Sequence, residues 1–133
     1  MLEFYGEQRE SELCVVLPTY NERDNLSDLV NRVTSMGFSV IVVDDSSTDG
    51  TFEIAKDLAE KGMVFLIERR GERGLATAIR VGIEQAKCPF VAVMDADFQH
   101  PPEVLPKILE KLKSGCDLVI ASRYTEGGGI QGW

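Results

Sequence analysis

Five short runs of consecutive apolar residues recur along the chain and predict buried strands. The runs are Leu13–Leu17, Val40–Val43, Met63–Ile67, Phe90–Met94 and Leu118–Ala121. Their apolar residues are nearly continuous instead of alternating with polar ones. This pattern is typical of parallel strands that are covered on both faces.

Stretches with a helical repeat separate these runs, because apolar residues recur in them about every 3.6 positions. The stretches are Leu26–Val33, Phe52–Ala59, Leu75–Ala86 and Val104–Leu112. Gly37, Gly62 and Gly115 follow three of them, as glycine often does at helix ends. The alternation predicts an α/β fold, a mostly parallel, Rossmann-like sheet with helices on both faces.

The chain is of single-domain size, with 133 residues. We expect residues 1–12 to be an N-terminal extension and residues 13–126 to be the α/β domain. Residues 127–133 begin with Gly127–Gly129 and are expected to form a glycine-rich loop.

Polar residues, most of them acids, follow each predicted strand. These segments are Pro18–Glu22, Asp44–Gly50, Glu68–Gly74, Asp95–His100 and Ser122–Tyr124. Ligands of open α/β sheets bind beyond the carboxyl ends of the strands. Asp45, Asp95 and Asp97 should therefore meet at one edge of the sheet.

The Asp95-Ala96-Asp97 segment predicts a cation site, because neighbouring carboxylates repel one another unless a cation lies among them. Two carboxylates and the Gln99 amide offer the hard oxygen ligands that suit Mg²⁺ or Mn²⁺ better than zinc. Such an ion could neutralise a departing nucleoside diphosphate as a Lewis acid. The alternative is that both acids only cap a loop.

The Asp44-Asp45 pair has two interpretations. Both acids could simply form a turn and cap the following helix, for which Ser47 and Thr48 are also candidates. We expect one acid to do so and Asp45 to remain free to accept hydrogen bonds from a base or ribose.

The other polar residues at these strand ends are individually ambiguous. Tyr20 could stack on a base or merely pack, and Arg123 could hold a phosphate or be a solvated charge. His100 is the only histidine, and a structural role is expected for it. The arginines of 69–73 are expected to lie in a solvated loop, with a phosphate contact as the alternative.

The charge balance argues against nucleic acid as the main partner, because 14 Lys+Arg face 22 Asp+Glu and the net charge is −8. The apolar runs are too short to span a bilayer, and the first 12 residues do not resemble a secretory signal. Cys14, Cys88 and Cys116 are odd in number and lack C-x-x-C spacing. We therefore expect core cysteines, neither a disulfide nor zinc, and a reducing compartment.

Several enzyme classes lack their motifs here. The chain has no P-loop, no G-x-G-x-x-G after the first strand and no G-x-S-x-G. A receiver-type signalling domain would carry its Asp pair after the first strand and a Lys after the last, where Arg123 stands instead. An Asp-x-Asp phosphatase would need Thr or Val soon after the pair, where Phe98-Gln99 follows.

Four segments occur together in a familiar order. They are Val15–Glu22, Val42–Thr51, Met94–Glu103, and Ser122–Tyr124 with the glycine run after it. Together they resemble the family 2 inverting glycosyltransferases of GT-A fold, and within them the dolichol-phosphate mannose synthases and related polyprenyl-phosphate glycosyltransferases.

The resemblance implies a role for each matching residue. The nucleoside pocket would be lined by Pro18, Tyr20, Glu22, Val43 and Asp45. The metal ligands would be Asp95, Asp97 and Gln99, which with Ala96 would also hold the diphosphate. Arg123 would contact the diphosphate or the sugar. Asp95, Asp97 and Arg123 would be the catalytic residues. Residues 127–133 would belong to a loop near the acceptor.

The resemblance also implies a reaction. GDP-mannose would be the donor and a polyprenyl or dolichyl phosphate the acceptor, in one inverting displacement. A catalytically silent nucleotide-sugar-binding module is the alternative. The protein would act on the cytoplasmic side, peripherally at the membrane. Catalytic domains of the family continue past the segment that matches 127–133, so we expect their C-terminal part to be missing here.

Overall fold

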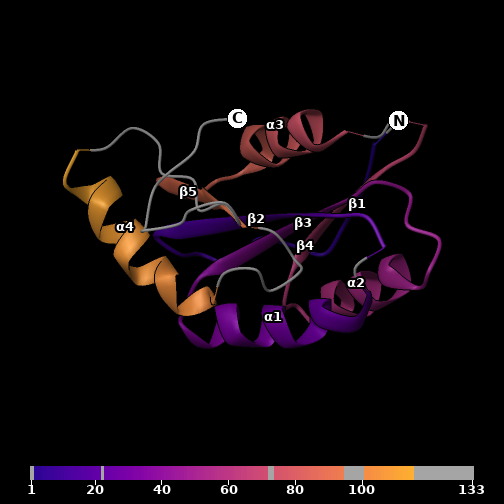
Figure 1. Cartoon of the computed structure of the whole chain (residues 1–133), viewed down its shortest axis with the longest axis horizontal. Coiled ribbons are helices and arrows are strands. Elements are labelled where there is room, and N and C mark those ends of the chain that lie inside the picture. The colour runs from indigo at the N-terminus through magenta and orange to yellow at the C-terminus, as the bar shows by residue number, and fades with distance from the viewer. Residues whose placement is uncertain (1, 22, 72–73, 95–100, 116–133) are drawn as a thin grey trace.

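The computed structural model describes residues 2–21, 23–71, 74–94 and 101–115. Strands and helices alternate along most of this length (Figure 1). The strands are β1 (Leu2–Tyr5), β2 (Leu13–Thr19), β3 (Ser39–Asp44), β4 (Phe65–Arg69) and β5 (Phe90–Val93). The α-helices are α1 (Arg23–Ser35), α2 (Thr51–Glu60), α3 (Leu75–Gln85) and α4 (Leu105–Lys113), with a 3₁₀ turn at Pro102–Val104.

The strands form one sheet in the order β1-β4-β3-β2-β5. Strands β4, β3, β2 and β5 run parallel, and β1 pairs antiparallel with β4. Figure 1 shows α1, α2 and α4 on one face of the sheet and α3 on the other. The predicted α/β sheet with helices on both faces is confirmed. The predicted strand 118–121 and the glycine-rich loop 127–133 lie outside the described residues.

Two apolar cores cover the two faces of the sheet. On the larger one, alternate strand residues such as Val15 and Val42 pack against the apolar stripes of α1, α2 and α4. On the smaller one, Val16 and Val43 pack with Ala78 and Ile79 of α3. Burial on both faces explains why the strand sequences are continuously apolar.

The first strand was not predicted. β1 lies within the segment expected to be an extension, and it pairs along β4 from Leu2 opposite Arg69 to Tyr5 opposite Leu66. Its four residues alternate between exposed and half-buried positions. Phe4 stacks on Phe65 of β4 with ring centroids 5.8 Å apart. A strand of four residues is too short to show a repeating pattern in the sequence.

The direction of winding reverses between β2 and β5. Helices α1 and α2 carry the chain from β2 to β3 and β4 on one face, whereas α3 returns it to β5 across the other (Figure 1). Open α/β sheets bind ligands in the crevice outside the carboxyl ends of the strands at such a point. The fold therefore places the candidate site beyond Thr19 and Val93.

Strand β4 ends two residues later than predicted. The sequence pattern favoured Met63–Ile67, but β4 runs from Phe65 to Arg69. Glu68 and Arg69 therefore belong to the strand, and Glu68 pairs with Asp44 in the parallel register. Because β4 extends to Arg69, this arginine lies at the end of a strand of the sheet.

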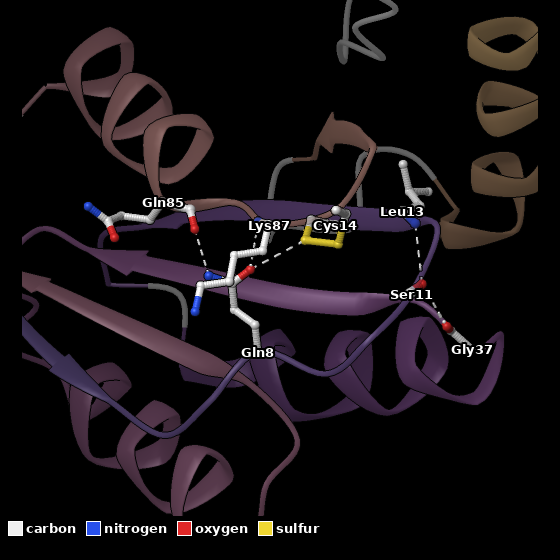
Figure 2. The surroundings of a disulfide bond; sticks show 8 residues. Gln8, Ser11, Leu13, Cys14, Gly37, Gln85 and Lys87 are labelled. Carbon is white, nitrogen blue, oxygen red and sulfur yellow. Dashed lines mark hydrogen bonds between the residues drawn. A yellow bond between two sulfur atoms is a disulfide. The ribbon is translucent and has the colours of Figure 1, made fainter.

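A disulfide joins Cys14 of β2 to Cys88, just before β5 (Figure 2). The expectation of no disulfide is therefore wrong. The cysteines no longer support the expectation of a reducing compartment. The two residues are 74 positions apart in sequence, with Cα atoms 5.5 Å apart. The spacing gave no signal because the parallel register, with Cys14 beside Val91, brings them together.

Among the described residues, no helix is both long enough and apolar enough to cross a membrane.

Helix α3 lies unusually close to the sheet at Gly82. A Cβ atom at this position would lie 2.5 Å from Cγ1 of Val16 and 3.2 Å from Cγ2 of Val43. Both neighbours are β-branched and fully buried, so neither can rotate away. Glycine is therefore required here although it is a poor residue for a helix interior.

We predict that Gly82→Ala lowers the free energy of unfolding by roughly 1–2 kcal/mol, because overpacking outweighs the gain in helix propensity. Urea denaturation measures the effect. In a Val16→Ala background, where the obstructing methyl groups are gone, the same substitution should cost clearly less. Equal costs in both backgrounds would contradict the close packing.

Candidate functional site

Hydrogen bonds join the loops that follow β2 and β3 at the carboxyl edge of the sheet. The backbone N–H of Asn21 donates to Oγ of Ser47 at 2.9 Å, and the N–H of Thr48 donates to Oδ1 of Asn21 at 2.9 Å. The N–H of Asp45 donates to the carbonyl of Thr19 at 3.0 Å. Asn21 takes the left-handed conformation, with φ of 56°. The two loops therefore form one unit beside the crevice.

Asp44 is the acid that shapes the turn. Its Oδ1 accepts from the hydroxyls of Thr19 at 2.7 Å and Ser47 at 2.6 Å, and its Oδ2 accepts from the N–H of Ser47 at 3.0 Å. The residue is fully buried. Burial raises the pKa of Asp44, and the hydrogen bonds from Ser47 and Thr19 only partly oppose this. Asp44 forms the turn that was predicted for one acid of the pair, but it does not cap the following helix, which begins after Gly50.

Asp45 is held by a buried ion pair, so its carboxylate is not free of protein partners, contrary to the expectation, whereas its role toward a base or ribose stays a prediction. Nε of Arg69 donates to Oδ1 of Asp45 at 2.7 Å and Nη2 donates to Oδ2 at 2.8 Å. The N–H of Gly74 adds a third bond, to Oδ2 at 3.1 Å. The side chains are 6% and 1% exposed for Asp45 and Arg69. Because β4 extends to Arg69, this guanidinium comes level with Asp45.

Arg69 also links β4 to the start of α3. Its Nη1 donates to Oγ1 of Thr77 at 2.8 Å, and Nη2 donates to the carbonyl of Gly74 at 3.0 Å. The carbonyl of Arg69 accepts from the hydroxyl of Ser46 at 2.7 Å. The expectation of a solvated loop is therefore wrong for Arg69. One buried side chain connects the β3 loop, β4 and α3.

Asp49 is hydrogen-bonded to Thr51, the first residue of α2. Its Oδ1 accepts from the N–H of Thr51 at 3.0 Å, and the hydroxyl of Thr51 also donates to it. The hydroxyl bond lowers the pKa of Asp49. Ser47 and Thr48 do not cap this helix, because Ser47 is committed to Asp44 and the helix begins after Gly50.

The structure brings four of the predicted nucleoside-pocket residues to the ends of β2 and β3. Pro18 is half-buried and is the register partner of Val43. Val43 is fully buried against α3, so only its backbone is near the edge. Tyr20 is 37% exposed, directly beyond β2. Asp45 follows the last residue of β3.

The remaining predicted site residues lie outside the described part of the chain. They are Glu22, Asp95, Ala96, Asp97, Gln99 and Arg123. Within ranges 2–21, 23–71, 74–94 and 101–115, no three acids, histidines or cysteines are grouped to hold a metal ion. The metal site therefore stays a prediction. Met94, which precedes Asp95, is buried and donates its N–H to Val16 of β2 at 3.0 Å.

Sequence reasoning missed the residues that support the site, chiefly Arg69, Thr77 and Asn21. An arginine followed by charged residues and glycines looks solvated, and its burial depends on where β4 ends. Asn21 carried a weak signal, since asparagine tolerates left-handed turns and makes local hydrogen bonds.

Comparison with known proteins identifies the family. The profile of "Glycosyl transferase family 2" matches residues 14–133. The chain belongs to glycosyltransferase family 2. This confirms the resemblance seen in the four segments, and it removes the basis for a receiver domain or a phosphatase.

Two curated relatives of this glycosyltransferase chain are considerably longer than it. "Dolichol-phosphate mannosyltransferase" of Pyrococcus furiosus is 44% identical over 126 residues, which cover 92% of this chain and 36% of the relative. "Polyprenol monophosphomannose synthase" of Mycolicibacterium smegmatis is 38% identical over 126 residues, which cover 90% of this chain and 48% of the relative.

A solved structure shares the GT-A-like fold of this chain. Residues 1–349 of TarS from S. aureus, crystallised in complex with UDP-GlcNAc, align with a TM-score of 0.61 and 27% identity. The alignment covers 78% of this glycosyltransferase chain and 32% of the TarS chain.

We predict that Arg69→Met lowers the free energy of unfolding by about 3–5 kcal/mol at neutral pH, because it leaves the buried Asp45 carboxylate without its cation. The double variant Arg69→Met/Asp45→Asn should recover part of this loss, since it removes the stranded charge. Chemical denaturation of the three proteins tests the cycle. A double variant as unstable as the sum of the single ones would contradict the pairing.

We predict that the contribution of Asp44 to the free energy of unfolding becomes more favourable as the pH falls. Its folded-state pKa is raised above the ordinary value of 3.8. This contribution to stability is therefore fully present below pH 3.8 and is lost as the pH rises through the raised pKa. The free energy of unfolding of the wild type, relative to Asp44→Asn, should grow as the pH is lowered from 7 toward about 4.

Asp57→Asn, at an exposed acid of α2, controls for the loss of a surface charge. If the difference between wild type and Asp44→Asn stays flat over this range or falls with decreasing pH, the raised pKa is wrong.

Proposed function

We propose that this chain is the nucleotide-sugar-binding part of an inverting, metal-dependent glycosyltransferase that moves mannose from GDP-mannose to a polyprenyl or dolichyl phosphate. The observation that carries the proposal is the match to two relatives named for mannosyl transfer to dolichol phosphate and for polyprenol monophosphomannose synthesis. These matches extend over 92% and 90% of the chain.

The fold supports a nucleoside site at the ends of β2 and β3. The proposed lining is Pro18, Tyr20, Glu22, Val43 and Asp45. A carboxylate has about four positions at which it can accept a hydrogen bond. Among the described residues, Arg69 and Gly74 fill one on Oδ1 of Asp45 and two on Oδ2. The remaining position on Oδ1 is the one we assign to a base N–H or a ribose hydroxyl.

The cation site is proposed at the residues that follow β5. Asp95, Asp97 and Gln99 would hold Mg²⁺ or Mn²⁺, and Arg123 would contact the diphosphate. When bound, the ion would neutralise the charge of the departing diphosphate. The fold favours this placement, because Met94 joins the end of β5 to β2 at the point where the winding reverses.

The catalytic contribution of the chain is positioning and stabilisation of charge. A lipid phosphate is already ionised near neutral pH, so its oxygen needs no strong general base to attack the anomeric carbon. The ion pair and the joined loops fix the nucleoside end of the donor before reaction. An acceptor with a polyprenyl tail also requires work at a membrane surface, which we propose to be the cytoplasmic face.

A nucleotide-sugar-binding module without transferase activity is the second candidate. The matches cover 36% and 48% of the two curated relatives, so they support nucleotide-sugar binding by this part of the fold separately from transfer. Binding without transfer would distinguish it from the first proposal.

We predict that GDP-mannose with Mn²⁺ raises the melting temperature more than UDP-GlcNAc with Mn²⁺ or GDP-mannose with EDTA. A ligand at 100 times its Kd contributes about 2.7 kcal/mol to stability. Asp97→Asn should lose the Mn²⁺-dependent part of the shift, and Asp28→Asn, at an exposed acid on α1, should keep it.

Equal Mn²⁺-dependent shifts in melting temperature for Asp97→Asn and Asp28→Asn would contradict the proposed cation site. A larger shift with UDP-GlcNAc than with GDP-mannose would show that the donor is wrong, but it would agree with a nucleotide-sugar site in this fold. Mannose transfer to dolichyl phosphate by the full-length polypeptide then separates the enzyme from the silent module.

A further inference from the structure

The disulfide lies at the end of the sheet opposite the candidate site. Cys14 is the second residue of β2, and Cys88 lies in the turn between α3 and β5. A hollow of about 380 Å³ lies beside it. The hollow is lined by Gln8, Arg9, Glu10, Ser11, Lys87 and Cys88.

The two halves of the disulfide differ in access. Cys14 is fully buried, between the sheet and α3, whereas Cys88 is half-buried and lines the hollow. Cys88 is therefore the more accessible half of the disulfide for a thiol or disulfide from solvent. In the reduced protein, Cys14 is also the poorer first nucleophile, because a buried thiol does not meet a disulfide from solvent.

We propose that Cys88 is a site of thiol–disulfide exchange with small anionic thiol compounds of the glutathione class, and that Cys14 is its resolving cysteine. Arg9 and Lys87 bring two positive charges to the hollow and Glu10 one negative charge. This balance favours a partner that carries carboxylates. The proposal does not depend on the function proposed above.

The exchange balances in two steps. In the reduced protein, the Cys88 thiolate attacks one sulfur of a disulfide RSSR, forms Cys88–S–SR and releases RS⁻, which takes up a proton. Cys14 then attacks the Cys88 sulfur and expels the second RS⁻, which takes up the proton that Cys14 loses. Two cysteine thiols are thus oxidised, and one RSSR is reduced to two RSH.

Gln8 contacts both the disulfide and the turn that holds Cys88. Its Nε2 donates to the carbonyl of Gln85 at 2.6 Å, and its Oε1 accepts from the N–H of Lys87 at 2.9 Å. The same Oε1 lies 3.7 Å from Sγ of Cys14. Figure 2 shows this side chain reaching from the segment between β1 and β2 to the turn that holds Cys88. Gln8 is thus a positioning residue that keeps the turn against β2.

The bond also determines how firmly β5 is held. It closes a span of 74 residues that contains α1, β3, α2, β4 and α3. A cross-link over so long a span strongly restricts the unfolded chain. Reduction should therefore lower the melting temperature on the order of 10 °C.

The test uses the whole chain with Cys116→Ser, so that only two thiols react. The reduced protein is treated with glutathione disulfide and followed by intact mass. The parent should lose two thiols without a lasting adduct, because Cys14 resolves it. Adding Cys14→Ser should trap one glutathione on Cys88. Adding Cys88→Ser should leave Cys14 unmodified in the folded protein, which circular dichroism checks.

Two further measurements sharpen the test. Gln8→Ala should accelerate adduct formation in the Cys14→Ser protein severalfold, and Ser11→Ala, at another residue lining the hollow, should not. Cystamine, a cationic disulfide, should react more slowly than glutathione disulfide.

Several results would overturn the assignment. Adduct formation on Cys14 as fast as on Cys88 would contradict the assignment of Cys88 as the first nucleophile. A faster reaction with cystamine than with glutathione disulfide would contradict the preference for an anionic partner. If either cysteine variant does not fold, trapping of the parent with N-ethylmaleimide during exchange identifies the cysteine that carries glutathione. Equal melting temperatures of the oxidised and reduced parent would refute the effect on stability.

Discussion

The ion pair between Asp45 and Arg69 is the interaction on which the carboxyl edge of the sheet depends. Removing two charges from water is costly, and the cost is repaid only when geometry and additional hydrogen bonds satisfy both groups. Here two parallel bonds join them, and Gly74 and Thr77 provide the other hydrogen bonds to the two charged groups. The β3 loop, β4 and α3 must therefore all be in place for the pair to form. This makes Asp45 a fixed acceptor rather than a mobile one.

The fold could be predicted from the sequence because burial on both faces leaves a direct trace. Runs such as Val40–Val43 and stripes such as Leu26–Val33 identify strands and helices without knowledge of their partners. Edge strand β1 lacked that trace, since one side of it faces solvent. The disulfide was missed for a different reason. Cys14 and Cys88 meet only because β2 and β5 are neighbours, and a pattern of local periods does not contain that information.

The candidate site was predicted less completely than the fold. The turn role of one acid follows from the chemistry of Asp and Ser near helix starts, and Asp44 fills it. The burial of Arg69 depends on a strand ending two residues later than the apolar run, which lies within the uncertainty of any boundary drawn from sequence. The metal role predicted for Asp95 and Asp97 comes from their spacing after a predicted strand as well as from the family resemblance, and both residues lie outside the described part of the chain.

The segment before β2 is part of the folded domain. The family profile starts at residue 14, yet β1 covers the edge of β4 and Gln8 holds the turn before β5. Gly6 turns the chain against the end of α2, where a Cβ atom would lie 2.8 Å from the carbonyl oxygen of Val64. A boundary drawn at the family profile would cut through the folded unit. It would also uncover a strand edge able to pair with other chains, the usual starting point for aggregation of β-proteins.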